Sequence, residues 1–116
     1  MNIKRLRRSA LTFEQAIFNR REWGHIFESA VGAYIVSQAF VKRFEVYYWR
    51  ERNDEVDFIL RKKGAVVAVE VKSNAEKSTL GLNKFKELFK PKTAFVVGDG
   101  GISAEEFLSM DLNKLF

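Results

Sequence analysis

Two carboxylates and an amine lie close together in the middle of this 116-residue sequence, where they could hold a metal ion. Asp57 is followed thirteen residues later by Glu70, and Lys72 comes two residues after Glu70. The runs that contain them, residues 55–60 and 65–72, are rich in β-branched residues and predict two neighbouring strands. Carboxylates that share one sheet surface repel each other unless a cation neutralises them, and a divalent metal ion is the economical candidate.

The connection between the two strands decides whether Asp57 and Glu70 face the same way. Residues 61–64, Arg-Lys-Lys-Gly, are typical of a hairpin loop. A loop of two or four residues leaves both carboxylates on one face, whereas a loop of three turns one over unless a bulge intervenes. The opposite face is wholly apolar and is predicted to be core; its residues are Val56, Phe58, Leu60, Val67, Val69 and Val71.

The periodicity of the whole chain predicts a mixed α/β fold in the order α-α-β-β-β-α-β-α. Helices are expected at residues 12–20, 23–41 and 79–89 and from the cap Ser103 to Met110; strands are expected at 44–50, 55–60, 65–72 and 93–97. A mostly antiparallel start then meets one β-α-β crossover, so the sheet is mixed and flanked by helices. The length suits a single domain, predicted at residues 12–116 after an N-terminal arm at residues 1–11.

The basic excess is concentrated at the N-terminus. The net charge is +5, and residues 1–21 alone carry six basic side chains against one acidic one, which leaves the rest of the chain neutral. Lys4, Arg5, Arg7 and Arg8 are therefore predicted to contact DNA phosphates. The alternative is a solvated end with no ligand.

The composition excludes several other classes of site. The chain has no cysteine, so disulfides and thiolate metal sites are absent. No apolar run reaches the roughly 18 residues needed to span a membrane, and no signal-peptide pattern opens the chain. We therefore expect a cytoplasmic protein with no membrane partner.

Glu28 is a third carboxylate with an unusual setting. Gly24 and Gly32 lie one helical turn before and after it on the same line of the helix surface. Each glycine costs a helix about 1 kcal/mol relative to alanine, so either the sheet or a bound backbone is expected to approach this line closely. The alternative is an ordinary solvated helix glutamate.

Together, Glu28, Asp57 and the Glu70-x-Lys72 pair resemble a known pattern. They come in the order found in the PD-(D/E)XK nuclease superfamily, which includes restriction endonucleases and archaeal Holliday-junction resolvases. That superfamily has a mixed sheet flanked by helices, so the resemblance implies a restriction-endonuclease-like fold.

A closer resemblance covers roughly residues 10–110. The chain is similar to the C-terminal domain, of unknown function, of a family of prokaryotic AAA-type ATPases. The segments that carry this resemblance are Trp23 to Gly32, Tyr48-Trp49-Arg50, Glu55 to Phe58, Val69 to Ser73, Gly81-Leu82 and Phe85. The phosphate-binding loop Gly-x-x-x-x-Gly-Lys-Ser/Thr is absent, so we expect either a C-terminal fragment or a stand-alone remnant without the ATPase half.

The resemblance implies a role for each of these residues. Asp57, Glu70 and the Val71 carbonyl would hold Mg²⁺ or Mn²⁺, which prefer oxygen ligands. Lys72 would orient the nucleophilic water or neutralise the phosphate, and Glu28 would take an outer-shell or second-metal role. The catalytic residues would then be Glu28, Asp57, Glu70 and Lys72. Ser73, in the connection after the strand, is a further candidate for contact with the DNA backbone.

Two functions of different classes follow. The first is a metal-dependent DNA endonuclease, structure-selective because no base-reading motif occurs, for which a homodimer would allow both strands to be cut. The second is a non-catalytic module that binds nucleic acid or a partner on behalf of an ATPase chain. The purely structural alternative is that Glu70 pairs with Lys72 on an exposed strand face, while Asp57 pairs with Arg50 or Arg61.

Overall fold

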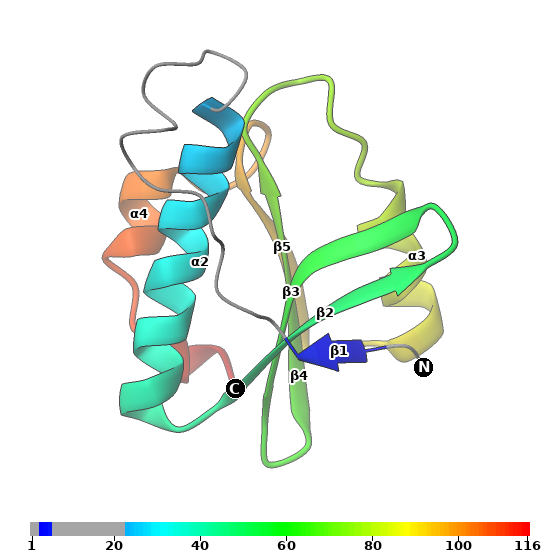
Figure 1. Ribbon diagram of the computed structural model, residues 1–116. Helices are drawn as coiled ribbons and strands as arrows, with labels where there is room; N and C mark the ends of the chain where they lie inside the picture. Colours follow the sequence, from blue (N-terminus) through cyan, green and yellow to red (C-terminus); the bar gives the residue numbers. More distant parts are fainter. Residues whose placement is uncertain (1–2, 6–22) are drawn as a thin grey trace.

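The computed structural model describes residues 3–5 and 23–116, which form a five-stranded sheet between helices (Figure 1). The strands are β1 (Ile3–Arg5), β2 (Glu45–Glu51), β3 (Asp54–Lys62), β4 (Ala65–Lys72) and β5 (Thr93–Gly98). The helices are α2 (Trp23–Lys42), α3 (Leu80–Phe89), α4 (Ala104–Leu108) and the 3-10 helix η2 (Leu112–Leu115). The predicted mixed α/β fold is confirmed.

The strands lie side by side in their order along the chain. Each neighbouring pair from β1 to β4 is antiparallel, and β5 runs parallel to β4. The parallel pair is joined through α3, because strands that run in the same direction need a crossover connection. The predicted antiparallel start and β-α-β crossover are therefore correct, whereas the helix predicted at residues 12–20 lies outside the described residues.

Local sequence signals set several of the element ends. α3 ends just before Pro91, with Lys90 in the left-handed conformation. The Ser103 hydroxyl accepts a hydrogen bond from the Glu106 amide at 3.1 Å and caps α4, as predicted. The short helix η2, which follows the N-cap Asp111, was not predicted. None of the described helices is long and apolar enough to cross a membrane.

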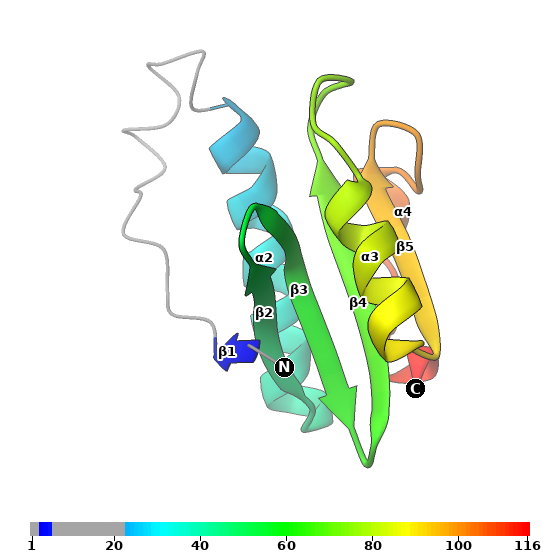
Figure 2. The ribbon, with the colours of Figure 1, turned by 90° about the vertical axis from the view of Figure 1, so that its right-hand side faces the viewer.

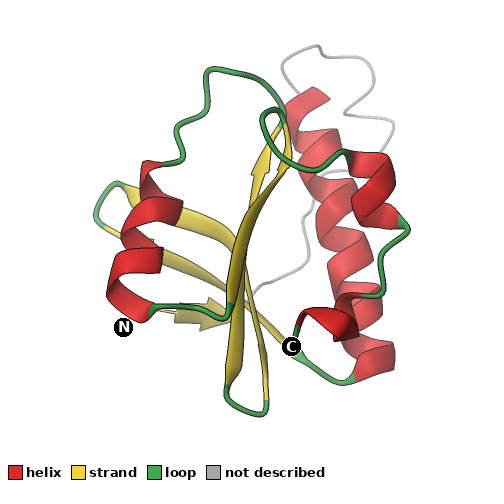
Figure 3. Cartoon of the chain, turned by 180° about the vertical axis from the view of Figure 1, so that it is seen from behind, coloured by secondary structure: helices red, strands yellow, loops and turns green. Residues whose placement is uncertain are grey.

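The sheet carries helices on both of its faces. Figure 2 shows α3 in front of the sheet with α2 and α4 behind it, and Figure 3 shows the sheet between its helices from behind the view of Figure 1. A core cluster therefore lies on each face of the sheet. This explains why β4 is buried from Val67 to Val71 without a break.

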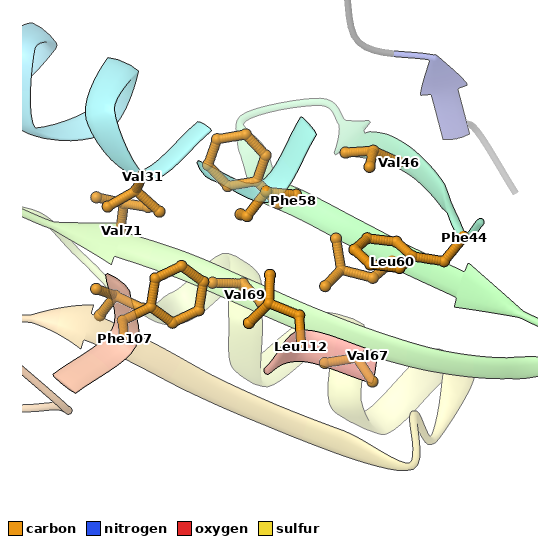
Figure 4. Close-up of a cluster of buried hydrophobic side chains, with 12 residues drawn as sticks. Val31, Phe44, Val46, Phe58, Leu60, Val67, Val69, Val71, Phe107 and Leu112 are labelled. Carbon is orange, nitrogen blue, oxygen red and sulfur yellow. The ribbon is translucent and has the colours of Figure 1, made fainter. Parts of the chain in front are cut away.

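The larger cluster, the α2-side core, lies between the sheet and the helices α2, α4 and η2 (Figure 4). Five of the six residues predicted to form the apolar face belong to it. Its members are Val31, Ile35, Phe44, Val46, Phe58, Leu60, Val67, Val69, Val71, Val97, Phe107 and Leu112. Gly32 of α2 packs here as well: a Cβ at that position would lie 3.1 Å from the ring of Phe58, so the close neighbour expected beside this glycine is the sheet.

The smaller cluster, the α3-side core, lies on the opposite face under α3. Its members are Trp49, Val56, Ile59, Ala68, Leu82 and Phe85. Gly81 allows α3 to pack this closely, because a Cβ there would lie 2.2 Å from the Glu55 carbonyl oxygen. The polar face predicted from alternation is therefore largely a second core.

The prediction that Val56 shares a face with Phe58 and Leu60 is wrong. Tyr47 pairs with Ile59 and Trp49 pairs with Val56, so a step of two residues along β2 corresponds to a step of three along β3. This extra residue is a β-bulge, which shifts the alternation of side chains by one position. The Val56 side chain therefore packs in the α3-side core. The bulge contains Asp57.

The first described segment also differs from the expected arm. Ile3–Arg5 pair with Tyr47–Trp49 as the edge strand β1. Lys4 and Arg5, two of the predicted phosphate-binding residues, therefore lie in a strand, with Lys4 opposite Tyr48 and Arg5 opposite Tyr47. Arg7 and Arg8 lie outside the described residues.

Candidate functional site

The ladder between β3 and β4 ends before it reaches the carboxylates. The last paired residues at this end are Phe58 and Val69, while β4 continues beside β5, with Val71 opposite Val97. The Val71 amide and carbonyl both face the space that β3 vacates: the amide donates to Asp57 Oδ2 at 2.8 Å, and the carbonyl accepts from Lys77 Nζ at 2.7 Å. Polar backbone groups are therefore available at the split between these two strands.

Asp57 fills part of this split with its side chain. The side chain is 10% exposed, and its Oδ2 accepts hydrogen bonds from the Val71 amide and from Lys77 Nζ at 2.7 Å. Because the ladder between β3 and β4 ends at Phe58 and Val69, the Asp57 carboxylate accepts the hydrogen bond of the Val71 amide in place of a ladder carbonyl. Asp57 thus joins the end of β3 to β4 and also places a negative charge at the split.

Glu70 is the charged residue that the fold buries most deeply within residues 26–116. It is 1% exposed, and its Oε1 lies 3.2 Å from Lys77 Nζ without the geometry of a hydrogen bond. Within the described part of the chain, this oxygen and Trp49 Nε1 are the buried side-chain polar atoms that lack a hydrogen-bond partner. Such a buried acceptor is costly unless something satisfies it.

Lys77 brings these groups together. It lies in the loop of residues 73–79 between β4 and α3, which in Figure 1 passes over the same end of the sheet as the first turns of α2. Its Nζ lies 2.7 Å from Asp57 Oδ2, 2.7 Å from the Val71 carbonyl oxygen and 3.2 Å from Glu70 Oε1. These are the three groups that were predicted from the sequence to hold a metal ion.

Glu28 lies on the outer side of the same ammonium. Its Oε1 is 4.0 Å from Lys77 Nζ, and its side chain is 39% exposed. The helix α2 thus delivers the third predicted carboxylate to the site, but at a longer distance than the two strand carboxylates. Glu28, Asp57, Glu70 and Val71 therefore all surround one cationic nitrogen.

Burial and neighbouring charges shift the pKa values of the two strand carboxylates in opposite directions. Burial raises the pKa of Asp57, but its neighbours outweigh burial and leave the pKa lowered. The largest of these opposing effects is a hydrogen bond with Glu70, followed by the charge of Lys77 and by hydrogen bonds from Lys77 and the Val71 amide. Burial, reinforced by the hydrogen bond and charge of Asp57, raises the pKa of Glu70 to about 9 despite Lys77. At neutral pH the coupled pair therefore holds one proton and one negative charge between its two carboxyl groups.

The same neighbours keep Lys77 charged. Burial lowers the pKa of Lys77, but the charge and hydrogen bond of Asp57, followed by the charges of Glu70 and Glu28, outweigh it and raise the pKa. The site is therefore built around an ammonium ion.

The lysine that the sequence predicted lies elsewhere. Lys72 Nζ is 3.9 Å from Asp99 Oδ2, at the end of β5, so the partner of the two carboxylates is Lys77 and not Lys72. Ser73, which begins the loop, is exposed. Nothing in the spacing of the sequence indicated Lys77, because only the path of an irregular loop brings it back over β4.

The arginines proposed as structural partners of Asp57 also have other contacts. Arg61 forms an ion pair with Glu45 at 3.0 Å, and Arg50 Nε donates to the carbonyl of Arg52 at 3.3 Å. The alternative in which Asp57 pairs with Arg50 or Arg61 is wrong. The exposed-face alternative for Glu70 is also wrong, since this side chain is buried.

The chemistry of the donor set suits a hard divalent cation. Two carboxylates and a main-chain carbonyl converge on one point, all of them oxygen donors of the kind that Mg²⁺ and Mn²⁺ prefer, and one buried oxygen lacks a hydrogen-bond partner. Among the described residues, no group of three or more carboxylate or imidazole side chains is compact enough to hold a metal ion. A metal ion here would thus depend on Asp57, Glu70, the Val71 carbonyl and water.

Residues 23–108 match the model of a family described as a domain of unknown function, DUF4143. Domains of this family are typically found with AAA ATPases, which agrees with the resemblance drawn from the sequence. No curated protein and no solved structure matches the chain.

Proposed function

Because the chain belongs to the DUF4143 family, whose function is unknown, we propose its function from the geometry of the site: a metal-dependent DNA endonuclease-like domain that hydrolyses phosphodiester bonds. The observation that carries this proposal is the convergence of Asp57, Glu70 and the Val71 carbonyl on a single cation position at the β3–β4 split. The order of these residues resembles that of the PD-(D/E)XK nucleases, which supports the same conclusion.

The fold supplies what such a site needs from the protein. Two adjacent strands hold the oxygen donors, so their positions are fixed by the sheet and not by a flexible loop. The chemistry supplied by a bound Mg²⁺ or Mn²⁺ would be activation of water and stabilisation of negative charge at the phosphate. Glu28, on the exposed side of the site, would act from the outer shell, and Lys72 would neutralise charge near the phosphate.

The proposed substrate is DNA because of the distribution of charge. The basic excess of the chain lies in residues 1–21, of which Lys4 and Arg5 form part of the edge strand β1. Ser73 is exposed in the loop that adjoins the site. Phosphate contacts from such residues would position a duplex without reading its sequence. A homodimer would then allow both strands of a duplex to be cut.

A second candidate function is a non-catalytic module that binds nucleic acid or an ATPase partner chain. It is favoured by Lys77, whose ammonium balances the single negative charge shared by Asp57 and Glu70. It is also favoured by the apolar side chains that α2 leaves exposed: Val36 is 46%, Phe40 is 87% and Val41 is 65% exposed. Exposed apolar residues that lie together are typical of a surface that binds another protein.

The test is DNA cleavage with matched aspartate variants. Wild type, Asp57→Asn and Asp54→Asn are incubated with linear, flapped and branched DNA in Mn²⁺ or Mg²⁺, and the products are separated by size. Asp54 is the control because it lies in the same strand and pairs with Lys84 on the surface, away from the split. We expect cleavage by wild type and Asp54→Asn, and a loss of about 10²-fold or more in Asp57→Asn.

Each result separates the two candidates. Cleavage by Asp57→Asn at the wild-type rate would exclude this site as the nuclease centre. Binding of DNA by the wild type with no cleavage under any of these conditions would favour the non-catalytic module.

A further inference from the structure

The three groups suited to a metal ion already share one cation, and that cation is part of the chain. Lys77 Nζ lies within 3.2 Å of Asp57 Oδ2, Glu70 Oε1 and the Val71 carbonyl oxygen. Bonds from these oxygens to Mg²⁺ or Ca²⁺ would measure about 2.0–2.6 Å. An ammonium ion and a divalent cation cannot both lie among the same three oxygens, because their centres would nearly coincide and like charges repel.

We propose that Lys77 is a tethered cation that occupies the divalent-metal position in the metal-free protein and has to leave it before a metal ion can bind. This inference rests on the proposed metal site, and it assigns to Lys77 the control of metal affinity. Metal binding and the ammonium contact are then two mutually exclusive states of the same site.

The position of Lys77 in the chain permits such a displacement. Asp57 and Glu70 belong to strands, whereas Lys77 lies in the loop of residues 73–79, most of whose side chains are exposed. Two other hydrogen bonds of this loop are local, from the Glu76 amide to Asn74 Oδ1 and from the Leu80 amide to Ser78 Oγ. Withdrawal of Lys77 would therefore leave the pairing of β4 with β5 intact.

Glu28 provides a place for the displaced ammonium. Its carboxylate lies 4.0 Å from Lys77 Nζ on the side toward solvent, where its side chain is 39% exposed against 2% for Glu70. A short outward movement would shorten the contact with Glu28 while it opens the three inner oxygens. Lys77 would thus remain close to the site and be ready to return when the metal ion leaves.

Lys77 also compensates charge in the metal-free protein. The two carboxylates lie next to each other in a low-dielectric environment, where an uncompensated charge is costly. The ammonium contact compensates Asp57, and Glu70 Oε1 still lacks a hydrogen-bond partner among the described residues. The ammonium therefore leaves one buried oxygen of the site without a hydrogen-bond partner. A metal ion that coordinates this oxygen would supply the interaction that it lacks.

The first test measures Mn²⁺ affinity by the EPR signal of free Mn²⁺. The proteins are wild type, Lys77→Met and the control Lys84→Met, which removes a lysine that pairs with Asp54 and not with the site carboxylates. If Lys77 holds the site for at least nine-tenths of the time, its removal should tighten Mn²⁺ binding by about tenfold or more. Loss of the general charge alone, in Lys84→Met, should change the affinity by no more than about threefold.

The outcomes separate this inference from the proposed function. Equal Mn²⁺ affinity in wild type and Lys77→Met, or weaker binding by the variant, would overturn the displacement while leaving the metal site in place. Absence of Mn²⁺ binding in all three proteins would contradict the proposed metal-dependent function itself, and the inference with it.

A second test uses the wild type and so does not depend on the folding of a variant. Reductive methylation of lysine side chains, followed by mass spectrometry, is compared with and without Mg²⁺. Lys84 is the internal control, since it pairs with Asp54 at 3.0 Å on the surface. We expect Mg²⁺ to increase methylation of Lys77 several-fold relative to Lys84. A Lys77 signal that is unchanged by Mg²⁺, at concentrations at which Mg²⁺ displaces bound Mn²⁺ in the EPR measurement, would overturn the displacement.

Discussion

Two lysine–aspartate pairs at the same end of β3 have almost the same separation between their charged atoms and very different surroundings. Lys84 pairs with Asp54 at 3.0 Å, and the two side chains are 42% and 29% exposed. Lys77 pairs with Asp57 at 2.7 Å, and there the exposed fractions are 30% and 10%, with the buried Glu70 alongside. The aspartates are three residues apart in one strand. The comparison shows how the contribution of an ion pair to stability depends on whether it lies on the surface or beside a core.

The surroundings decide how much each pair matters. A pair in water gains little, because both ions give up hydration and side-chain freedom when they meet. A carboxylate that is nine-tenths buried has given up most of its hydration whether or not it is paired, so removal of its partner is costly. Asp57 lies in the bulge of β3 and accepts a hydrogen bond from β4, whereas Asp54 is the first residue of β3.

Removal of Asp57 should change stability more than any other substitution considered, and removal of Asp54 provides the comparison. Asp57→Ala leaves the Val71 amide and Lys77 without their partner, and it should reduce the free energy of unfolding by about 3–5 kcal/mol. Asp54→Ala should reduce it by less than about 1 kcal/mol. Urea unfolding followed by circular dichroism measures both values. Equal reductions would mean that burial does not distinguish the two pairs.

A more modest effect is expected from pH, through Glu70. Its pKa is raised from 4.5 to about 9 in the folded protein, so between these values the folded state holds a proton that the unfolded state has released. The contribution of Glu70 is therefore fully present below pH 4.5 and disappears as pH rises toward 9. The free energy of unfolding should fall by on the order of 2 kcal/mol from pH 5 to pH 9, well within the limit of about 1.4 kcal/mol per pH unit for one proton.

The control for this prediction is Glu70→Gln, which resembles the protonated carboxyl and does not titrate. Its free energy of unfolding should vary less with pH over the same range, as measured by urea unfolding at each pH. Asp57 acts in the opposite sense, because its lowered pKa makes a contribution that disappears only at acidic pH. Identical pH profiles for wild type and Glu70→Gln would mean that Glu70 is ionised at neutral pH.

The weakest effect concerns charges remote from both pairs. If the proposed function is correct, Lys4→Gln with Arg5→Gln should weaken DNA binding and reduce the slope of log affinity against log salt by up to about 1.8, near 0.9 for each phosphate that the variant no longer neutralises. The double variant Lys86→Gln with Lys92→Gln, at exposed positions of α3 and of the turn after it, is the control for general charge. An unchanged slope in Lys4→Gln with Arg5→Gln would mean that these two residues contact no phosphate and that any DNA binding depends on the candidate site.

The elements that were predicted correctly from the sequence are those with a strong period. The run from Ala65 to Lys72 is typical of a strand because half of its residues are valine, and the helix from Trp23 shows the three-and-four spacing of an apolar stripe. The bulge at Asp57 could not be predicted in this way, because one additional residue leaves no mark on composition. The edge strand Ile3–Arg5 was missed because a basic tripeptide has no alternation to detect.

The candidate site shows the same limit more sharply. Strand alternation and order along the chain were enough to identify Asp57 and Glu70 and to place them on neighbouring strands. The folded arrangement was needed to show that Lys77, and not Lys72, is their partner, and that Glu70 is buried. Alternation follows from local backbone geometry, which any short run of residues carries within itself. The path of a loop and the packing of α3 on the sheet depend instead on contacts between segments far apart in the chain.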